Sequence, residues 1–414
     1  MRGSAVAEPV RGVPERGLQV LRRSASEPWL VAALVLVLYA VSLFAAYHNG
    51  RDARWFIKIG QHFVLLSHAS PEIRLDPRCN CDLSQFGYDG QFSYYIALDP
   101  EHARYYMDDP AYRYGRILYP AAARVLALGR SDLVPDTLIL INLLALAGGT
   151  LALAVWLRRS GFSPWPALLF GLYPGLFVSL QRDLTEPLAY ALVALGIYLF
   201  DAAGRRRLLW AGISFGLAAL ARETTLVFAG TYALGVLLGG SPGDGWRRRV
   251  GENWTGVVLF LDLALIPTLL YRGFLFVWLG QVGVPASNGP TLIPLQGLFA
   301  STPHPSEHLT EAFCIVLPGL ICLALGAWAV IRGGWTKELG ALLLCDLLFV
   351  VFLNGHSYEE FFASGRIAGA VVLAALLSLP RFLRLSNGTS GWLWTAALLC
   401  YLPWYALLPL AGGS

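Results

Sequence analysis

One aspartate stands out in this sequence because of the residues that follow it. Asp89 lies in the segment GYDGQFSYYIALDP (residues 87–100), which is rich in aromatic, amide and hydroxyl side chains. A carboxylate in such a setting can accept a proton from a hydroxyl group as that group attacks a substrate. We therefore take Asp89 as the first candidate for a catalytic residue, and its role depends on the elements that hold this segment.

Other ionisable residues lie where long apolar segments end, in QRDLTEP (residues 181–187), RETT (residues 222–225) and residues 359–366. Ionisable side chains at membrane depth are costly, so they tend to face a cavity and to pair with one another. They predict a functional site on the side of Asp89, although ion pairs that merely close helix ends would look the same in sequence. The residues concerned are Arg182, Asp183, Glu186, Arg222, Glu223 and Arg366.

The composition indicates a multi-pass membrane protein. Of the 414 residues 56% are hydrophobic and only 14% are charged, whereas soluble domains carry about 25% charged residues. A spanning helix needs roughly 20 mostly apolar residues to cross a hydrocarbon core of about 30 Å. Eleven stretches fit, some only with tilt or partner helices. They lie near 29–46, 136–156, 164–180, 187–201, 208–221, 224–240, 255–279, 311–331, 338–353, 362–380 and 391–410.

These stretches predict an all-α polytopic protein with a cytoplasmic leader (residues 1–28) and a single transmembrane domain (residues 29–410). Lys and Arg mark cytoplasmic loops, and here they gather in the leader and in alternate short connections, such as residues 158–159 and 205–207. We therefore predict a cytoplasmic amino end, an extracytoplasmic carboxyl end and an extracytoplasmic Asp89. The net charge of +4 then reflects arginine clusters that face anionic lipid headgroups, and nucleic acid binding is not indicated.

Two long loops face outward in this topology. The first, residues 47–135, is too long for a plain connection. Apolar residues at helical spacing predict amphipathic interfacial helices at 53–66 and 115–128. The second long outer loop is residues 280–310. We expect the first loop to fold onto the membrane surface and to carry the chemistry.

This layout resembles the GT-C superfamily of polytopic glycosyltransferases, in which a long first outer loop carries an essential acidic residue. The segment YDGQFSYYIA (residues 88–97) is similar to the Asp-Gly-x-x-Tyr-x-x-Ile-Ala type of motif in bacterial members, with Ser93 in the tyrosine position. It resembles more distantly the Trp-Asp-x-x-His-Phe-x-x-Ile-Ala stretch of phosphatidylinositol-glycan mannosyltransferases. The likeness in topology covers most of the chain, and the motif covers about ten residues.

A rival alignment places the essential acid directly after the first helix. Asp52 begins the segment DARW, which is similar to the Asp-Glu-Ala-Arg-Tyr stretch of aminoarabinose transferases and protein O-mannosyltransferases but lacks its Glu. Asp89 and Asp52 are therefore both candidate catalytic residues, with Asp89 preferred.

The resemblance implies an inverting glycosyltransferase in a bacterial plasma membrane. Its donor would be a sugar on polyprenyl phosphate, and its acceptor a hydroxyl group of a lipid, glycan or protein. A carboxylate would act as general base, and arginines would stabilise the departing phosphate. Arg116, Arg222 and Arg366 are the candidates for that contact.

The remaining candidates for substrate binding have alternative roles. Tyr88, Phe92, Tyr94 and Tyr95 could form a stacking wall for the sugar, or the rings could anchor the loop among the headgroups. Gln91 is a further candidate for substrate binding. The acids near residues 183, 186 and 223 could orient arginines, bind the acceptor or hold a divalent cation. We name no metal ligand, leave metal dependence open and expect no organic cofactor.

Two other classes of function remain open. HPSEH (residues 304–308) fits the His-x-x-Glu-His pattern of inverted zinc peptidases, but Pro303 and Pro305 disfavour the helix that this geometry needs. A lipid or glycan transporter or flippase would show inverted repeats with helices broken in mid-membrane. No such repeat is visible, and the polar residues gather at the outer edge.

Overall fold

The computed structural model describes residues 27–60, 62–63, 86–202, 206–238, 246–283, 289–301 and 305–385. Within these ranges every regular element is a helix, and the only β-type pairing is a single isolated bridge between Ile59 and Gly87. The leader is described only at its last two residues, and the predicted stretch 391–410 lies outside the described residues. The predicted all-α class is confirmed for the described part of the chain.

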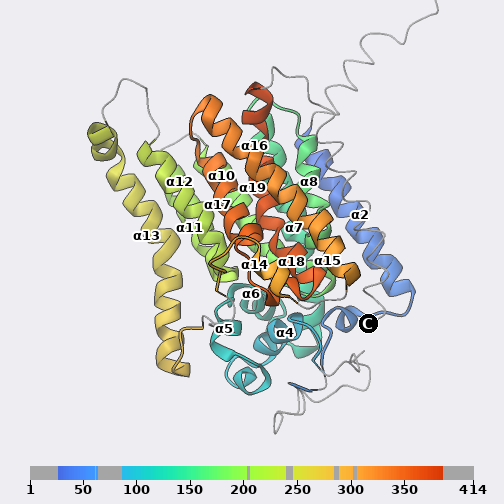
Figure 1. Cartoon of the computed structure of the whole chain (residues 1–414). Coiled ribbons are helices and arrows are strands. Elements are labelled where there is room, and N and C mark those ends of the chain that lie inside the picture. The colour runs from blue at the N-terminus through green and yellow to red at the C-terminus, as the bar shows by residue number, and fades with distance from the viewer. Residues whose placement is uncertain are drawn as a thin grey trace, which may run out of the picture.

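The helices form a bundle that is covered at one end by a layer of shorter helices (Figure 1). The long elements of the bundle are α2 (Pro28–His48), α7 (Val134–Arg159), α10 (Glu186–Phe200), α11 (Arg207–Ala221), α12 (Leu226–Leu238), α13 (Trp246–Leu279), α16 (Leu317–Gly333), α17 (Lys337–Asp346) and α19 (Gly369–Leu385). Shorter elements of the bundle are η4 (Trp165–Ala167), α8 (Leu168–Gly171), α9 (Pro174–Gln181), η5 (Glu223–Thr225), α14 (Gln296–Ala300), α15 (Pro305–Glu311), η7 (Ala312–Val316), η8 (Leu347–Val351), η9 (His356–Tyr358) and α18 (Phe361–Ile367).

Five described helical segments are long and apolar enough to cross a membrane: Pro28–His48, Ser131–Arg159, Trp254–Leu279, Glu307–Gly333 and Phe361–Leu385. The apolar helices Glu186–Phe200, Arg207–Ala221 and Glu223–Leu237 are shorter. At 1.5 Å per residue, a 15-residue helix is about 22 Å long, which is less than a hydrocarbon core of about 30 Å. The five long segments make the chain a multi-pass membrane protein.

The predicted stretch 164–180 is not one continuous helix. It divides into η4, α8 and α9, with a break at Leu172 and Tyr173 before Pro174 starts α9. Proline has no N–H to donate and fits best in the first turn of a helix, so a new helix begins at this residue. The break lets the end of α9 approach the site described below.

The bundle is held by close packing of small and aromatic residues. A Cβ added at Gly216 of α11 would lie 2.3 Å from the carbonyl oxygen of Leu263 in α13, so this glycine lets the two backbones approach closely. The rings of Phe215 and Phe260 fill the space beside this crossing, with their centroids 5.5 Å apart. Such packing stabilises helices within a membrane, where lipid gives little hydrophobic driving force for association.

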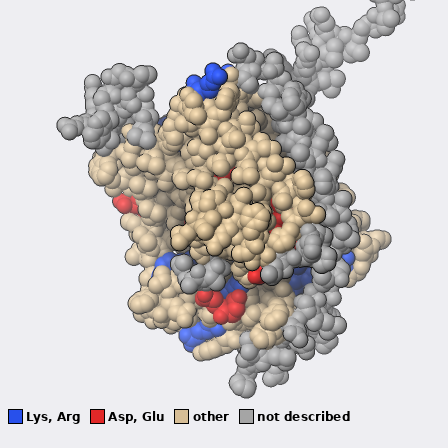
Figure 2. All heavy atoms as spheres, viewed as in Figure 1, with Lys and Arg blue, Asp and Glu red and all other residues tan. Residues whose placement is uncertain are grey.

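The covering layer comes from the first long loop. It contains η1 (Ala53–Phe56), α4 (Gly90–Leu98), η2 (Ala103–Tyr106), α5 (Pro110–Tyr114), α6 (Leu118–Leu126) and η3 (Ser131–Leu133). Buried side chains, among them Tyr95, Tyr106 and Leu138, give the layer an apolar core that continues onto the end of α7. Figure 2 shows charged side chains gathered where this layer meets the bundle, whereas the side of the bundle above is largely uncharged.

One of the two predicted interfacial helices is present and the other is wrong. The segment 115–128 contains α6, as expected. In the segment 53–66 the described residues do not form one continuous helix: the turn η1 ends at Phe56, Lys58 has a left-handed backbone (φ 54°), and Ile59 pairs with Gly87. This distant pairing brings the chain back toward Asp89, and a pattern of local periodicity cannot reveal it.

Candidate functional site

Asp89 is placed by the tight packing of the residue that follows it. It immediately precedes α4, and a Cβ on Gly90 would lie 1.9 Å from the carbonyl oxygen of Arg182 at the end of α9. The Gln91 side chain fixes the approach of the chain, since its oxygen accepts the N–H of Gly60 at 2.9 Å and its amide donates to the carbonyl of Phe86 at 2.7 Å. The covering layer is thus fastened to the bundle beside Asp89.

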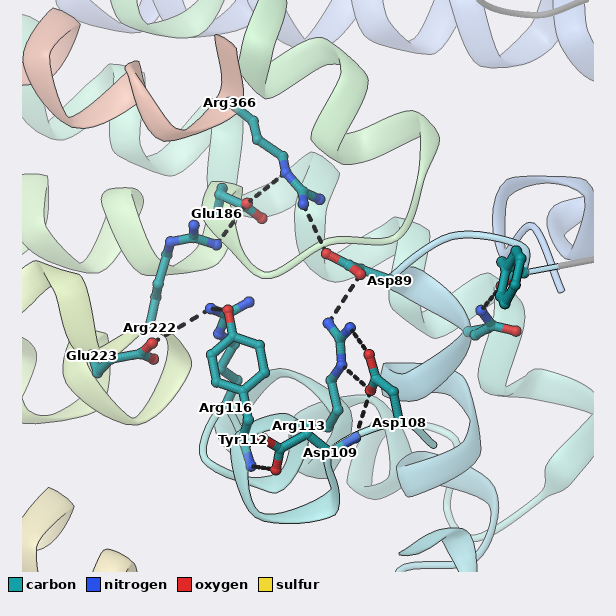
Figure 3. A network of polar contacts seen from close by, with 12 residues as sticks. Asp89, Asp108, Asp109, Tyr112, Arg113, Arg116, Glu186, Arg222, Glu223 and Arg366 are labelled. Carbon is teal, nitrogen blue, oxygen red and sulfur yellow. Dashed lines mark hydrogen bonds and ion pairs between the residues drawn. The ribbon is translucent and has the colours of Figure 1, made fainter. Parts of the chain in front are cut away.

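Two arginines bind the Asp89 carboxylate, one on each oxygen (Figure 3). Arg113 of α5 donates to Oδ1 at 2.9 Å, and Arg366 of α18 donates to Oδ2 at 2.7 Å. Arg113 also makes a two-point pair with Asp108, at 2.8 and 2.6 Å, and its guanidinium lies 4.2 Å from the centre of the Phe92 ring. Asp89 therefore joins the covering layer to the bundle through charge-assisted hydrogen bonds.

A second row of charges lies on the bundle side of Asp89. Glu186, at the start of α10, accepts from Arg222 at 2.6 Å, and the Nε atom of Arg366 lies 3.6 Å from the same oxygen. Glu186 and Arg222 are both almost fully buried. Three helix ends thus meet through one carboxylate, which needs these partners because an isolated buried charge is costly.

The third group centres on Glu223 in η5. Arg116 lies 3.4 Å from one oxygen of Glu223, and Arg272 of α13 lies 3.8 Å from the other. The guanidinium of Arg116 also stacks on the Tyr112 ring at 4.4 Å and donates to the hydroxyl of that tyrosine. These ion pairs are longer than those at Asp89, so Arg116 and Arg272 are held less tightly to protein carboxylates.

The charged groups surround a cavity of about 660 Å³ between the covering layer and the bundle. Its lining combines charged side chains with apolar ones, which come from the first long loop, α12, η8 with the two residues after it, and α18. The apolar residues are Phe63, Phe86, Phe92, Leu226, Val227, Leu348, Phe349, Phe352, Leu353, Ala363 and Ile367. The charged lining comprises five arginines (Arg113, Arg116, Arg222, Arg272 and Arg366) and five acidic residues (Asp89, Asp108, Glu223, Glu359 and Glu360).

The electrostatics of the covering layer follow from this arrangement. Burial by itself would raise the pKa of Asp89, but Arg113 and Arg366 hold it well below the ordinary carboxyl value. For Arg116, burial favours the neutral form, and the neighbouring Tyr112 and Glu223 nevertheless raise its pKa. Asp89 and Arg116 are therefore both fully charged at neutral pH.

Comparisons with protein-family models, curated proteins and solved structures gave no match to this chain. The site must accordingly be interpreted from its own geometry.

The structure brings most of the predicted site residues to this cavity. Asp89, Arg116, Arg222, Glu223 and Arg366 line it together with Tyr88 and Gln91, and Glu186 lies just behind Asp89. Arg182 lies beside them, with its guanidinium 4.6 Å from the centre of the Tyr88 ring. Residues predicted from five separate segments therefore meet in one place.

Three predicted site residues lie elsewhere. Asp52 caps η1 by accepting the N–H of Arg54 at 3.0 Å, away from the cavity lining. Tyr95 is fully buried in the core of the covering layer. Asp183 is fully buried beneath Gly90, in a left-handed backbone (φ 49°), and burial raises its pKa well above the ordinary value. We therefore do not assign substrate contacts to these residues.

The sequence analysis did not identify Arg113, Asp108 and Arg272, and it included Glu360 only as part of the segment 359–366. Arg113 and Arg116 lie three residues apart, a spacing that places both on one face of a helix. That signal was present but weak in a loop with many charges. Arg272 lies in the apolar part of α13 (Trp254–Leu279), and an arginine within such a segment is itself a sign of function.

The described residues contain no group of three or more His, Cys, Asp or Glu side chains arranged to hold a metal ion. The zinc-peptidase pattern is described only in part, because His304 lies outside the described residues. Pro305 begins α15, so Glu307 and His308 lie in a helix.

Proposed function

We propose that this protein is an inverting glycosyltransferase that moves a sugar from a polyprenyl-phosphate donor to an acceptor hydroxyl on the extracytoplasmic side of a membrane. One observation carries the proposal: a cavity at the end of a membrane bundle is lined both by arginines and by many apolar side chains. A lipid-linked sugar likewise combines an anionic phosphate with an apolar chain.

Arg116 and Arg272 are the arginines of the lining that we assign to phosphate binding. They share one carboxylate, Glu223, at 3.4 and 3.8 Å, whereas the pairs of Asp89 are at 2.9 and 2.7 Å. The Nε atom of Arg116 has no hydrogen-bond partner among the described residues. Guanidinium groups bind phosphate in a two-point fork and stabilise the charge that develops as phosphate departs.

The apolar part of the lining supports a lipid as the carrier of that phosphate. Leu226 and Val227 begin α12, and Leu348, Phe349 and Phe352 come from η8 and the residue after it. A soluble nucleotide sugar would gain little from such a surface, whereas a polyprenyl chain would bury apolar area against it, at about 25 cal/mol per Å². The tail would then extend from the cavity into the bilayer.

The proposal extends to the arrangement of the whole chain. The five long apolar segments, the three shorter apolar helices, the broken segment 164–180, the segment 338–353 and the stretch 391–410 would make a GT-C-like set of eleven spans in a bacterial plasma membrane. The amino end would be cytoplasmic, and the cavity and the carboxyl end extracytoplasmic. A divalent cation that accompanies the phosphate is compatible with the acidic residues of the lining.

Reconstitution tests this function directly. Purified protein in liposomes is given radiolabelled polyprenyl-phosphate sugars and a membrane extract as the acceptor. We expect donor-dependent labelling that falls at least about 100-fold in Asp89→Asn, because Arg113 and Arg366 lose their shared anchor. Asp52→Asn, which alters an exposed helix cap, serves as the comparison and should retain labelling.

The other outcomes are equally informative. Loss of labelling only in Asp52→Asn would move the site to the segment after the first helix. Liposomes that flip or accumulate a lipid without transferring a sugar would replace this proposal with transport.

A further inference from the structure

Sugar transfer to a hydroxyl group needs a group that accepts the hydroxyl proton, and Asp89 is poorly prepared for this. Both of its oxygens already receive hydrogen bonds from arginines, at 2.9 and 2.7 Å. A proton could be taken up only at the expense of these ion pairs, which hold the pKa of Asp89 low. A weaker base is a weaker proton acceptor near neutral pH.

Three other acids of the lining are similarly committed. Asp108 is held by the two-point pair with Arg113, and the two oxygens of Glu223 face Arg116 and Arg272. Glu359 pairs with His356 at 2.9 Å on an exposed surface. Among the described acids of the lining, Glu360 is then the one that forms no ion pair.

Glu360 is placed to face the cavity. It immediately precedes α18, yet its side chain does not cap the first turn of that helix. Arg366 of the same helix, Arg182 at the end of α9, and Asp89 and Tyr88 before α4 are the groups that act on its carboxyl. No ion pair within 4 Å holds Glu360 to any of them, in contrast to the other acids of the described lining.

The surroundings also suit proton uptake. Burial raises the pKa of Glu360 above the ordinary glutamate value, with Asp89 adding to the rise and Arg366 and Arg182 opposing it. On α15, which packs against α18, Glu311 accepts a hydrogen bond from Ser364 at 3.0 Å and is engaged there. A carboxylate with a raised pKa beside a cavity is a better general base at neutral pH.

We propose that Glu360 is the proton acceptor of this cavity and that Asp89 is a positioning residue that orients Arg113 and Arg366. This assignment rests on the proposed function. The acceptor oxygen forms a bond to the anomeric carbon while its proton passes to the Glu360 carboxylate. The bond from the anomeric carbon to the phosphate oxygen breaks, and its electron pair leaves with polyprenyl phosphate.

The test separates donor binding from transfer. Donor KM and single-turnover transfer rates are measured for wild type, Glu360→Gln, Glu360→Asp and Asp89→Asn, with an acceptor in which wild type is active. Glu101→Gln, an exposed acid of the covering layer outside the cavity, is the matched control. We expect Glu360→Gln to keep donor KM within about threefold while transfer falls about 100-fold or more, and Glu360→Asp to recover part of the rate.

The pH profile adds a readout that a structural role would not change. The wild-type rate should rise with pH through an apparent pKa above that of ordinary glutamate, and this limb should be absent in Glu360→Gln. A Glu360→Gln enzyme that transfers at the wild-type rate, or that keeps the same acid limb, would overturn the assignment and leave the glycosyltransferase function standing. Wild type that transfers no sugar from any donor would overturn both.

Discussion

Arg113 and Arg366 reach the two oxygens of Asp89 from positions 24 and 277 residues away in the sequence. Arg113 also pairs with Asp108, and Arg366 also pairs with Glu186. Removing the Asp89 charge would leave both arginines partly buried with one partner fewer. Loss of one member of a buried pair is strongly destabilising because the remaining charge is poorly compensated.

We expect Asp89→Asn to lower stability by about 3 kcal/mol at neutral pH. Because the pKa of Asp89 is lowered on folding, its contribution is complete above the unfolded carboxyl value near 4 and is lost as the pH falls through the folded value. The difference in Tm between wild type and Asp89→Asn in detergent should therefore stay constant from pH 8 to 5 and narrow only in stronger acid. A difference that vanishes near pH 6 would contradict this view of Asp89.

The two arginines on Glu223 lead to a separate prediction about the donor. Replacing Arg116 or Arg272 by lysine keeps the charge but removes the planar fork. We expect each change to raise the KM for a polyprenyl-phosphate sugar about tenfold, which corresponds to about 1.4 kcal/mol. Arg130→Lys, at an exposed arginine that pairs with Asp132, should leave KM unchanged. Unchanged KM in both lysine variants would move the phosphate elsewhere in the cavity.

At the residue scale, the sequence identified much of the site because charges are rare at the ends of apolar helices. Glu186, Arg222, Glu223 and Arg366 could be found in this way, since each charge there needs a partner. This argument does not identify Arg113 in the first long loop, because charged residues are common there and the three-residue spacing from Arg116 is only a weak signal. The pairing of Arg113 with Asp89 depends on how the loop folds, and residue type does not encode it.

At the scale of elements, the end of α9 and the start of α4 meet with no room for a side chain. Gly90→Ala would place a Cβ 1.9 Å from the carbonyl oxygen of Arg182. We expect the change to shift α4, reduce transfer and cost about 1 to 3 kcal/mol of stability. The measurements are Tm in detergent and donor-dependent labelling.

Gly148→Ala in α7 is the matched control, because a Cβ there meets no atom within 4 Å. Alanine also favours helices over glycine by about 1 kcal/mol, so this variant should be as stable as wild type or more so. Equal behaviour of the two alanine variants would show that the contact at Gly90 does not position the layer.

Elements that follow from local sequence signals could be predicted, whereas elements that depend on contacts between distant parts of the chain could not. Runs of apolar residues and helical periodicity are local signals, so α7 and α6 could be predicted with nearly correct bounds, and α13 with its correct end but a start nine residues late. The turn at Lys58 and the bridge from Ile59 to Gly87 depend on contacts with distant chain. The break before α9 could have been predicted from Pro174, which is a strong start signal for a new helix.

At the scale of the whole molecule, the orientation in the membrane sets where the cavity opens. In a chain in which all six native cysteines are replaced by serine, single cysteines at the exposed positions Ser131 and Ser163 probe the two ends of α7. We expect a membrane-impermeant maleimide to label Ser131→Cys in intact cells and Ser163→Cys only after permeabilisation. The reverse pattern would place the cavity in the cytoplasm and remove the reason for a lipid-linked donor.

The five arginines around the cavity balance its five acids, so the fully ionised lining has no net charge. A sugar on polyprenyl phosphate carries about one negative charge, and the phosphate released from it carries up to about two near neutral pH. If the acceptor proton stays on Glu360, the lining gains one positive charge as the phosphate gains one negative charge. The total charge within the cavity is then the same before and after transfer. No counter-ion has to enter or leave during the step, and the proton departs only when the charged product does.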